Sequence, residues 1–285
     1  MKTITIIDTF GFFFRSYFAL PPLRNSEGFP TGLLTGFANL VDSLHRDHST
    51  DYLVFALDAK GRTFRNDLYP DYKAHREAAP DDLLKQLPVA IEWIEQMGFA
   101  NLSREGFEAD DVITTVTKFA REKGLKVRIV SHDKDLYQMI DDGVVVMYDS
   151  VKKQEVDEQA CVEKFGVRPK DFINFQAILG DSSDNIPGVK GIGKVGAAKL
   201  INKYHTLEAI YDDVVNKDGH KIGQKDFKPL RFVDQCPGCL GAIVILYKCS
   251  RTHQYAKSKQ HKHRHFHGKN ILHPLHPLHR LSKRL

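Results

Sequence analysis

TITIID, residues 3–8, is rich in β-branched residues and ends on an aspartate. Comparable short runs occur at YLVFALD (52–58), KVRIVS (126–131) and VVVMY (144–148). Apolar residues with helical spacing lie between these runs, near 32–46, 82–97 and 110–123. Strands that alternate with helices predict an α/β fold, with a mainly parallel sheet and helices on both faces.

The composition is that of a globular protein. At 285 residues and 42% hydrophobic residues, the chain can hold one large domain or two small ones around a substantial core. No apolar run reaches the length of a membrane span, and MKTITIID leads into a strand instead of a signal-peptide core. We therefore expect a cytoplasmic protein that does not bind membranes. Cys161 is the only cysteine before residue 236, which excludes a disulfide framework.

Charge is unevenly distributed along the chain. Residues 235–285 contain ten Lys or Arg and no Asp or Glu, so the net charge of +5 leaves about −5 on residues 1–234. An acidic body can still bind a polyanion if its acids hold metal ions and its bases line the approach. The placement of the charges is therefore more informative than their sum.

Carboxylates follow the ends of the predicted strands. Asp8 closes the first strand, Asp58 closes the second, and Asp133 and Asp135 follow the third. The carboxyl ends of parallel strands share one edge of a sheet, where ligands usually bind. Two further stretches, EGFEADDV (105–112) at a helix N-terminus and LGDSSDNIPG (179–188) in a turn-rich loop, add Glu108, Asp110, Asp111, Asp181 and Asp184.

Each of these acids has a local alternative as a helix cap, a turn residue or a polar loop residue. Together, nine carboxylates along one edge would repel one another strongly unless divalent cations neutralise them. A donor set of carboxylates, with His132 as the one nearby imidazole, favours Mg²⁺ or Mn²⁺. We interpret the acids as a metal site.

Two basic elements accompany the acids. GRTFRNDLYPDYKAHREAAP (61–80) mixes cations with aromatic rings, which suits unpaired nucleic acid, although a solvated amphipathic loop would look similar. PGVKGIGKVGAAK (187–199) permits a tight hairpin whose N–H groups face an anion, or a plain helix–turn–helix joint. The candidate DNA-binding residues are Arg62, Arg65, Tyr72, Gly188, Lys190, Gly191, Gly193, Lys194 and Lys199. A GxGxxG motif after the first strand and a Walker loop are both absent from the sequence.

Taken in order, six motifs closely resemble the 5′-nuclease family, in particular the N-terminal 5′→3′ exonuclease domain of bacterial DNA polymerase I. They are IDTFGFFFRSYFAL, FALDAK, YKAHR, GFEADDV, SHDKDLYQ and GDSSDNIPGVKGIGKVGAAKL, and the match covers about residues 3–211. The resemblance implies a PIN-like fold with a helical arch and a helix–hairpin–helix module. One departure is the apolar turn after Asp8, which leaves every acid in place.

The resemblance also implies residue roles around two metal ions. The first metal group would be Asp8, Asp58, Glu108, Asp110 and Asp111, and the second Asp133, Asp135, Asp181 and Asp184. Arg15, Lys73 and Arg76 would contact the reacting phosphate, Tyr72 would stack near the substrate, and the glycine hairpin would grip duplex DNA, in some family members through K⁺. A helical YKAHR would place Lys73 and Arg76 on one face.

We expect three regions: a PIN-like catalytic domain (1–168), a helix–hairpin–helix module (169–213) and a His/Lys-rich tail (214–285). Within it, residues 235–285 lack acids and periodicity, which favours a truncated or out-of-frame, poorly ordered segment over a basic nucleic-acid tail. Its Cys236, Cys239, Cys249 and His253 could also be read as a small zinc site, but no periodic core surrounds them.

The sequence thus predicts a monomeric, metal-dependent 5′→3′ exonuclease or 5′-flap endonuclease that removes primers or flaps in DNA replication and repair. Its substrate would be a 5′ end or flap next to duplex, including an RNA primer. Two alternatives are a catalytically impaired DNA-junction binding fragment of a truncated DNA polymerase I, and an RNA-cleaving PIN domain that would not need the glycine hairpin. The chain is too short for a polymerase domain, so we expect no nucleotide transfer.

Overall fold

The computed structural model describes residues 1–46 and 50–216 and contains two compact units. The first unit comprises Met1–Gly61 and Glu77–Asp157. The second comprises Arg62–Arg76 and, among the described residues, 158–216. The tail beyond residue 216, including the Cys236, Cys239, Cys249 and His253 spacing, lies outside the described residues.

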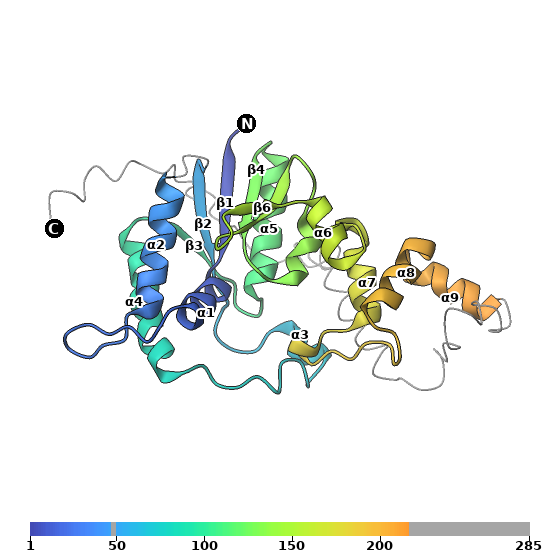
Figure 1. The fold of residues 1–285 in the computed structure, drawn as a ribbon, viewed down its shortest axis with the longest axis horizontal. Coiled ribbons are helices and arrows are strands. Elements are labelled where there is room, and N and C mark those ends of the chain that lie inside the picture. Colours follow the sequence, from blue (N-terminus) through green and yellow to red (C-terminus); the bar gives the residue numbers. More distant parts are fainter. Residues whose placement is uncertain (47–49, 217–285) are drawn as a thin grey trace, which may run out of the picture. The chain divides into compact units, whose positions relative to one another are not determined.

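A six-stranded sheet forms the centre of the first unit, in the order β3-β2-β1-β4-β5-β6 (Figure 1). All neighbouring strands are parallel except β5 and β6. The predicted α/β fold with a mainly parallel sheet is therefore confirmed. The strands are β1 (Thr3–Asp8), β2 (Tyr52–Ala56), β3 (Ala100–Leu102), β4 (Lys126–Val130), β5 (Val145–Asp149) and β6 (Gln154–Val156).

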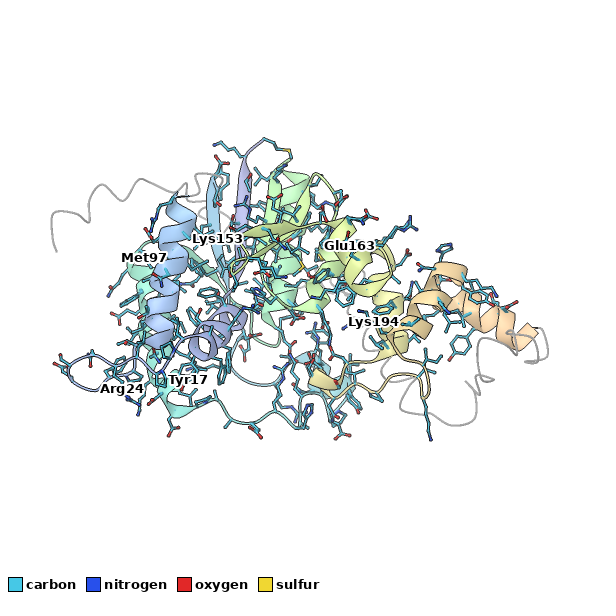
Figure 2. The ribbon with its side chains drawn as sticks, in the orientation of Figure 1. Tyr17, Arg24, Met97, Lys153, Glu163 and Lys194 are labelled. Atoms are coloured by element: carbon cyan, nitrogen blue, oxygen red, sulfur yellow. The ribbon has the colours of Figure 1, made fainter. Side chains whose placement is uncertain are left out.

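Helices cover both faces of this sheet. On one face, Ile7 of β1, Phe55 of β2 and Val130 of β4 join one apolar core with α1 (Thr9–Ala19), α2 (Gly32–Arg46) and α4 (Asp81–Gln96), and side chains fill the space between these elements (Figure 2). Strand residues that point the other way, such as Ile6, are also fully buried, and α5 (Ala109–Glu122) contacts β1, β2 and β4. Burial on both faces explains the continuous apolar character of the central strands.

The second unit is mainly helical. The rings of Phe165, Phe172 and Phe175 pack against one another with centroids 4.9–6.2 Å apart and form its core. Its helices are α3 (Phe64–Leu68), α6 (Glu158–Phe165), α7 (Phe172–Leu179), α8 (Lys194–Tyr204) and α9 (Leu207–Asn216), and its single-turn 3₁₀ helices are η2 (Pro169–Asp171) and η3 (Ser182–Asp184). A longer 3₁₀ helix in the first unit, η1 (Lys134–Met139), follows β4.

The predicted helices and main strands are confirmed, but YKAHR is not helical. Residues 70–75 form turns, and Lys73 has a positive φ of 57°. Its N–H donates to Asp184 O at 3.0 Å instead of to a carbonyl one helical turn earlier. Lys73 and Arg76 therefore do not share a helix face. Among the described residues, no helix has both the length and the apolar character that crossing a bilayer requires.

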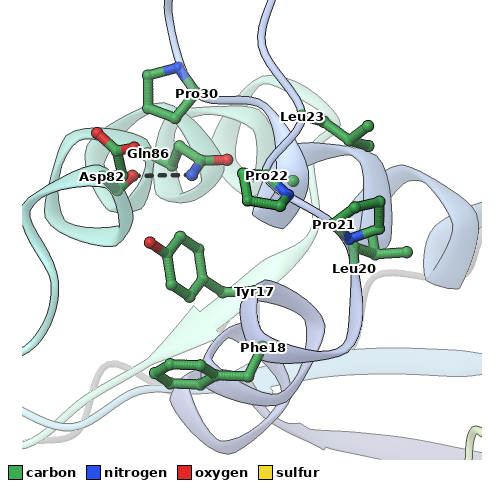
Figure 3. A pocket seen from close by; sticks show the side chains of 10 residues that line it. Tyr17, Phe18, Leu20, Pro21, Pro22, Leu23, Pro30, Asp82 and Gln86 are labelled. Atoms are coloured by element: carbon green, nitrogen blue, oxygen red, sulfur yellow. Dashed lines mark hydrogen bonds between the residues drawn. The ribbon is translucent and has the colours of Figure 1, made fainter.

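One buried side chain joins α4 to the start of α2. Gln86 is fully buried, and its Oε1 accepts hydrogen bonds from Leu33 N at 2.9 Å and Leu34 N at 3.3 Å. Its Nε2 donates to Asp82 O at 2.8 Å, which fixes the amide orientation (Figure 3). Because the first N–H groups of a helix have no intrahelical partners, Gln86 acts as a cap supplied from another helix.

We predict that Gln86→Leu lowers the free energy of unfolding by about 2 kcal/mol or more, because two buried N–H groups lose their acceptor. Urea unfolding followed by circular dichroism measures this change. Gln96→Leu is the matched control, because Gln96 is exposed on the same helix and bonds Glu92 one turn away; its expected change is within about 0.5 kcal/mol. Equal losses in the two variants would contradict the capping role of Gln86.

Candidate functional site

Asp8 lies at the carboxyl end of the central strand and is 7% exposed. Its Oδ1 accepts from Gly11 N at 3.1 Å, which caps α1, and its Oδ2 accepts from Ser131 Oγ at 2.6 Å. The parallel register pairs Ile7 with Val130, so it brings the residue after β4 beside Asp8. Asp8 is thus both a helix cap and part of a cluster of acids.

The N-terminus of α5 distributes its carboxylates among different tasks. Asp111 Oδ2 accepts from Glu108 N at 3.0 Å, so Asp111 acts in capping its own helix. Asp58, which follows β2, accepts from Ala109 N at 2.8 Å and supplies a second cap. Asp110 has a different environment, because the charges that face it are Asp133, Asp8, Asp135 and Glu108. Of the acids at this helix N-terminus, Asp111 therefore bonds the helix backbone, whereas Asp110 faces other carboxylates.

Two acids of the first unit, Asp8 and Asp110, have raised pKa values. Burial raises the pKa of Asp8 to about 6, against the lowering effect of its bonds from Ser131 and Gly11, and the charges of Asp133 and Asp58 raise it further. Burial is also the main cause that raises the pKa of Asp110 well above its ordinary value. Such shifts mark carboxylates that cannot all ionise without a compensating positive charge.

The donor chemistry of this cluster fits a hard divalent cation. Asp8, Asp58, Glu108, Asp110, Asp133 and Asp135 offer oxygen atoms only, which suits Mg²⁺ or Mn²⁺. His132, the nearby imidazole, bonds Asp149 on β5 through Nε2 at 3.1 Å. Although burial raises the pKa of Asp149, hydrogen bonds from Lys152 N, His132 and Val151 N lower it overall, so this pair forms a separate interaction.

Two residues that the sequence interpretation did not select position Asp8. Ser131 is buried, donates to Asp8 and accepts from Asp133 N at 3.0 Å, so it connects the first strand to the acidic turn. Gly11 leaves room for the carboxylate, since a Cβ there would lie 2.3 Å from Asp8 Oδ2. The signal was available, because Ser131 opens SHDKD and Gly11 lies one helical turn after Asp8.

In the second unit, Asp181 and Asp184 lie in a compact acidic loop and are 3% and 8% exposed. Asp181 Oδ1 accepts from Ser183 N at 3.0 Å and caps η3, while backbone bonds between Asp181 and Ile186 close the loop at 2.7 and 2.8 Å. The predicted convergence of this loop with the acids of the sheet edge joins the two units and stays a prediction.

Two glycines allow the acidic loop to pack on α7. A Cβ on Gly188 would lie 2.0 Å from Leu179 O, and a Cβ on Gly180, whose φ is +75°, would lie 2.2 Å from Gly188 N. Both clashes are with backbone atoms, which cannot move aside as a flexible side chain can. Gly188, which the sequence suggested as a DNA-binding residue, therefore has a packing role that fixes the positions of Asp181 and Asp184.

The predicted DNA-contacting cations differ in accessibility. Arg15 on α1 is exposed, and so are Arg62, Lys190, Lys194 and Lys199. Figure 2 labels Lys194 at the start of α8. Arg65 is only 6% exposed, with its guanidinium 4.7 Å from the Phe64 ring centroid, so the structure does not present it to a phosphate.

Three residues of the basic segment bind an acid of their own unit. Arg76 Nη2 lies 2.7 Å from Asp184 Oδ1, and the Tyr72 hydroxyl donates to Asp184 Oδ2 at 3.0 Å. Lys73 Nζ lies 3.9 Å from the same carboxylate. Tyr72 is 5% exposed, so its ring does not lie open for stacking in this arrangement.

The backbone of the predicted glycine hairpin turns sharply at Gly191. Gly191 has a φ of +85°, and a Cβ on Gly191 or Gly193 would meet no atom within 4 Å. Gly193 is the N-cap residue of α8, whose first N–H groups require partners. Exposed Lys190 and Lys194 lie beside this helix N-terminus, and its phosphate-binding role stays a prediction.

A cavity of about 190 Å³ lies in the first unit beneath the α1–α2 loop (Figure 3). Proline and aromatic side chains dominate its wall, among them Tyr17, Phe18 and Pro22. None of the predicted site residues lines it. The candidate site is therefore the cluster of carboxylates at the sheet edge and not this cavity.

Models of two protein domains match the sequence. The 5′-3′ exonuclease N-terminal resolvase-like domain matches residues 3–166, and the 5′-3′ exonuclease C-terminal SAM fold matches residues 167–228. A 5′-3′ exonuclease of Aquifex aeolicus is 40% identical over 210 residues, which cover 74% of this chain and 72% of that protein. The chain belongs to the 5′-3′ exonuclease family.

Other relatives of this 5′-3′ exonuclease family member are longer or more distant. DNA polymerase I of Deinococcus radiodurans is 41% identical over 210 residues, but the match spans only 22% of that protein. The flap endonuclease of bacteriophage T5, solved with DNA and metal ions, superimposes with a TM-score of 0.65 at 22% identity, covering 90% of this chain and all of that chain. This likeness confirms the PIN-like fold of the exonuclease family.

We predict that Gly188→Ala lowers the free energy of unfolding of this exonuclease by about 3 kcal/mol or more, because its Cβ would overlap backbone atoms. Gly193→Ala is the matched control, since φ is −92° and its Cβ meets no atom within 4 Å; the expected loss is below about 1 kcal/mol. Urea unfolding distinguishes the two variants. Similar stability of both would leave Gly188 without a packing role.

The raised pKa of Asp8 predicts a pH-dependent cost of folding. Since its pKa rises from 3.8 to about 6 on folding, the folded state binds the proton more tightly, and this contribution to stability decreases as pH rises from about 4 to 6. Asp8→Asn should therefore stabilise the protein in EDTA at pH 7.5 by up to about 3 kcal/mol and have no such effect at pH 4.

Urea unfolding of both proteins at several pH values measures this difference. Glu122→Gln is the control, because Glu122 is exposed at the far end of α5. Its effect should stay within about 0.5 kcal/mol at both pH values. If Asp8→Asn were as stable as the parent protein at pH 7.5, the Asp8 carboxylate would not carry an uncompensated charge.

Proposed function

We propose that this member of the 5′-3′ exonuclease family is a metal-dependent 5′→3′ exonuclease and 5′-flap endonuclease acting on DNA. The observation that carries the proposal is the set of carboxylates at the carboxyl ends of β1, β2 and β4, where burial and like charges raise the pKa values of Asp8 and Asp110. A divalent ion would remove that penalty. Acids with a purely structural role would gain nothing that offsets the cost of burying like charges together.

Nine carboxylates are proposed to hold two Mg²⁺ or Mn²⁺ ions. Asp8, Asp58, Glu108, Asp110 and Asp111 would form the first group, with Asp111 also capping α5, and Asp133, Asp135, Asp181 and Asp184 would form the second. When bound, such ions supply an activated water and stabilise the leaving oxygen. Ser131 and Gly11 hold the Asp8 carboxylate in place for this role.

The basic residues would bind and orient the substrate. Arg15, Lys73 and Arg76 are proposed to contact the reacting phosphate, where their charge offsets the charge that develops during hydrolysis. The hairpin with Gly191, Gly193, Lys190 and Lys194 would bind duplex backbone without reading base edges, with K⁺ as its candidate ion. Arg62 and Lys199 would add electrostatic attraction.

The proposed substrate is a 5′ end or flap next to duplex DNA, including a flap that begins as an RNA primer. The relatives named DNA polymerase I support a role beside replication and repair, and the T5 flap endonuclease was solved with DNA and metal ions. We propose a monomeric cytoplasmic enzyme. Its catalytic domain would be 1–168 and its DNA-binding module 169–213, a division supported by the junction of the two family models at 166–167.

We predict that Asp110→Asn reduces Mg²⁺-dependent cleavage of a labelled 5′-flap substrate at least about 100-fold, because it removes a metal-facing charge. Duplex binding, followed by fluorescence anisotropy, should change less than about threefold, because the hairpin binds phosphate independently of this acid. Glu122→Gln should cleave like the parent. Cleavage that persists in EDTA, or a fully active Asp110→Asn protein, would overturn the proposed function.

A further inference from the structure

The basic segment that follows β2 in sequence belongs to the second compact unit, together with the acidic loop. We call residues 69–76 the strap. Both oxygens of the buried Asp184 carboxylate accept hydrogen bonds from the strap, Oδ1 from Arg76 at 2.7 Å and Oδ2 from Tyr72 at 3.0 Å. Lys73 Nζ adds a positive charge 3.9 Å from Oδ2. The strap thus supplies charge compensation for an acid that is proposed to bind metal.

Backbone contacts hold the strap against the loop as well. Lys73 N donates to Asp184 O at 3.0 Å, and Asn185 Nδ2 donates to Asp71 O at 2.9 Å. Lys73 and Asn185 both have positive φ values, 57° and 61°, a conformation that lysine rarely adopts. Tyr72 and Ile186 bury each other, with Tyr69 packed against them. The contact is therefore a defined docked arrangement that includes backbone strain.

We propose that the strap and a divalent cation compete for Asp184, so that metal binding at this acid releases the strap. The proposal rests on the proposed function, because it takes Asp184 as a metal ligand. A cation on either oxygen of Asp184 would share that carboxylate with the Arg76 guanidinium. Two positive charges so close together in a buried site repel strongly. The hydrogen bonds from Arg76 and Tyr72 also occupy one acceptor position on each oxygen, which leaves less negative charge available to a metal.

Competition for Asp184 has a consequence for the order of events. While the strap is docked, Arg76 and Tyr72 are engaged with Asp184, and Tyr72 is buried. Release would free Arg76, Lys73 and Tyr72 for the phosphate and the unpaired bases of a substrate. Residues that bind DNA would become available once the acidic loop holds its cation, which links substrate capture to metal loading.

Hydrogen exchange on the full chain, without DNA, tests the release directly. The amides of Tyr72, Ala74 and Arg76 donate within the docked strap, and that of Lys73 donates to Asp184 O. Saturating Mn²⁺ should accelerate their exchange about tenfold or more relative to EDTA, because release removes the acceptor Asp184 O and the turn that it supports. Amides within α4 should not change. Unchanged or slower exchange of the strap in Mn²⁺ would overturn the proposal.

Metal affinity gives a readout that is independent of strap motion and of catalysis. Titration calorimetry with Mn²⁺ should show a binding phase that Asp184→Asn removes. Tyr72→Phe deletes one donor without altering charge, and it should tighten that phase about fivefold or more, because hydrogen bonds to a charged group are among the stronger ones. Arg76→Gln should tighten the same phase at least as much.

Arg168→Gln is the charge-matched control for Arg76→Gln. Arg168 is exposed in the same unit and pairs with Asp171, and its removal should change the affinity less than about twofold. If Tyr72→Phe left the Mn²⁺ affinity unchanged, the competition model would be wrong. Absence of any Mn²⁺ binding would overturn both this inference and the proposed function, whereas Mn²⁺-dependent flap cleavage with an unchanged strap would overturn this inference alone.

Discussion

Repulsion among carboxylates at one edge of the sheet is the constraint on which the candidate site depends. The parallel register of β1 with β2 and β4 brings Asp8, Asp58 and the turn after β4 together, so their proximity follows from the backbone and not from side-chain choice. Burial then makes each charge more costly, as the raised pKa values of Asp8 and Asp110 show. The strands and helices around the site therefore hold these carboxylates close together against their mutual repulsion.

Local hydrogen bonds offset part of this cost. Ser131 and Gly11 stabilise the Asp8 carboxylate, and Asp58 and Asp111 satisfy N–H groups at the start of α5. The same acids therefore cap helices and form the candidate metal group. An acid that caps a helix is already held in position before a cation binds. The entropic cost of ordering its side chain on binding is therefore smaller.

The second unit also buries a carboxylate, but there a cation and a hydroxyl group compensate its charge. Asp184 is buried in a loop that Gly180 and Gly188 allow to pack against α7, and its charge is compensated by Arg76 and Tyr72 from a distant segment. Arg76 and Tyr72 bond the same carboxylate oxygens that the proposed metal ion would use. The acidic loop and the basic segment are therefore best understood as one system, although 108 residues separate Arg76 and Asp184 in the sequence.

The sequence by itself determined the class of fold and the identity of the acids. Alternation of β-rich and helical segments predicted the parallel sheet, and aspartates at successive strand ends predicted one acidic edge, because periodicity and strand direction are local properties. It did not reveal β3 or α1, since three residues are too few for a pattern and FGFFF lacks one. These short elements depend on neighbours for their stability.

Tertiary structure alone decided what the individual side chains do. YKAHR has helical spacing, yet Lys73 N bonds Asp184 O, because a contact across the chain replaces the local helix. Arg65 is a cation in a basic stretch, yet it is buried. Gly188 belongs to a hairpin motif, yet it is required for packing, because a Cβ at this position would overlap Leu179 O. For Lys73 the deciding partner lies in a distant segment, and a pattern of neighbouring residues cannot encode a distance between segments that only folding brings together.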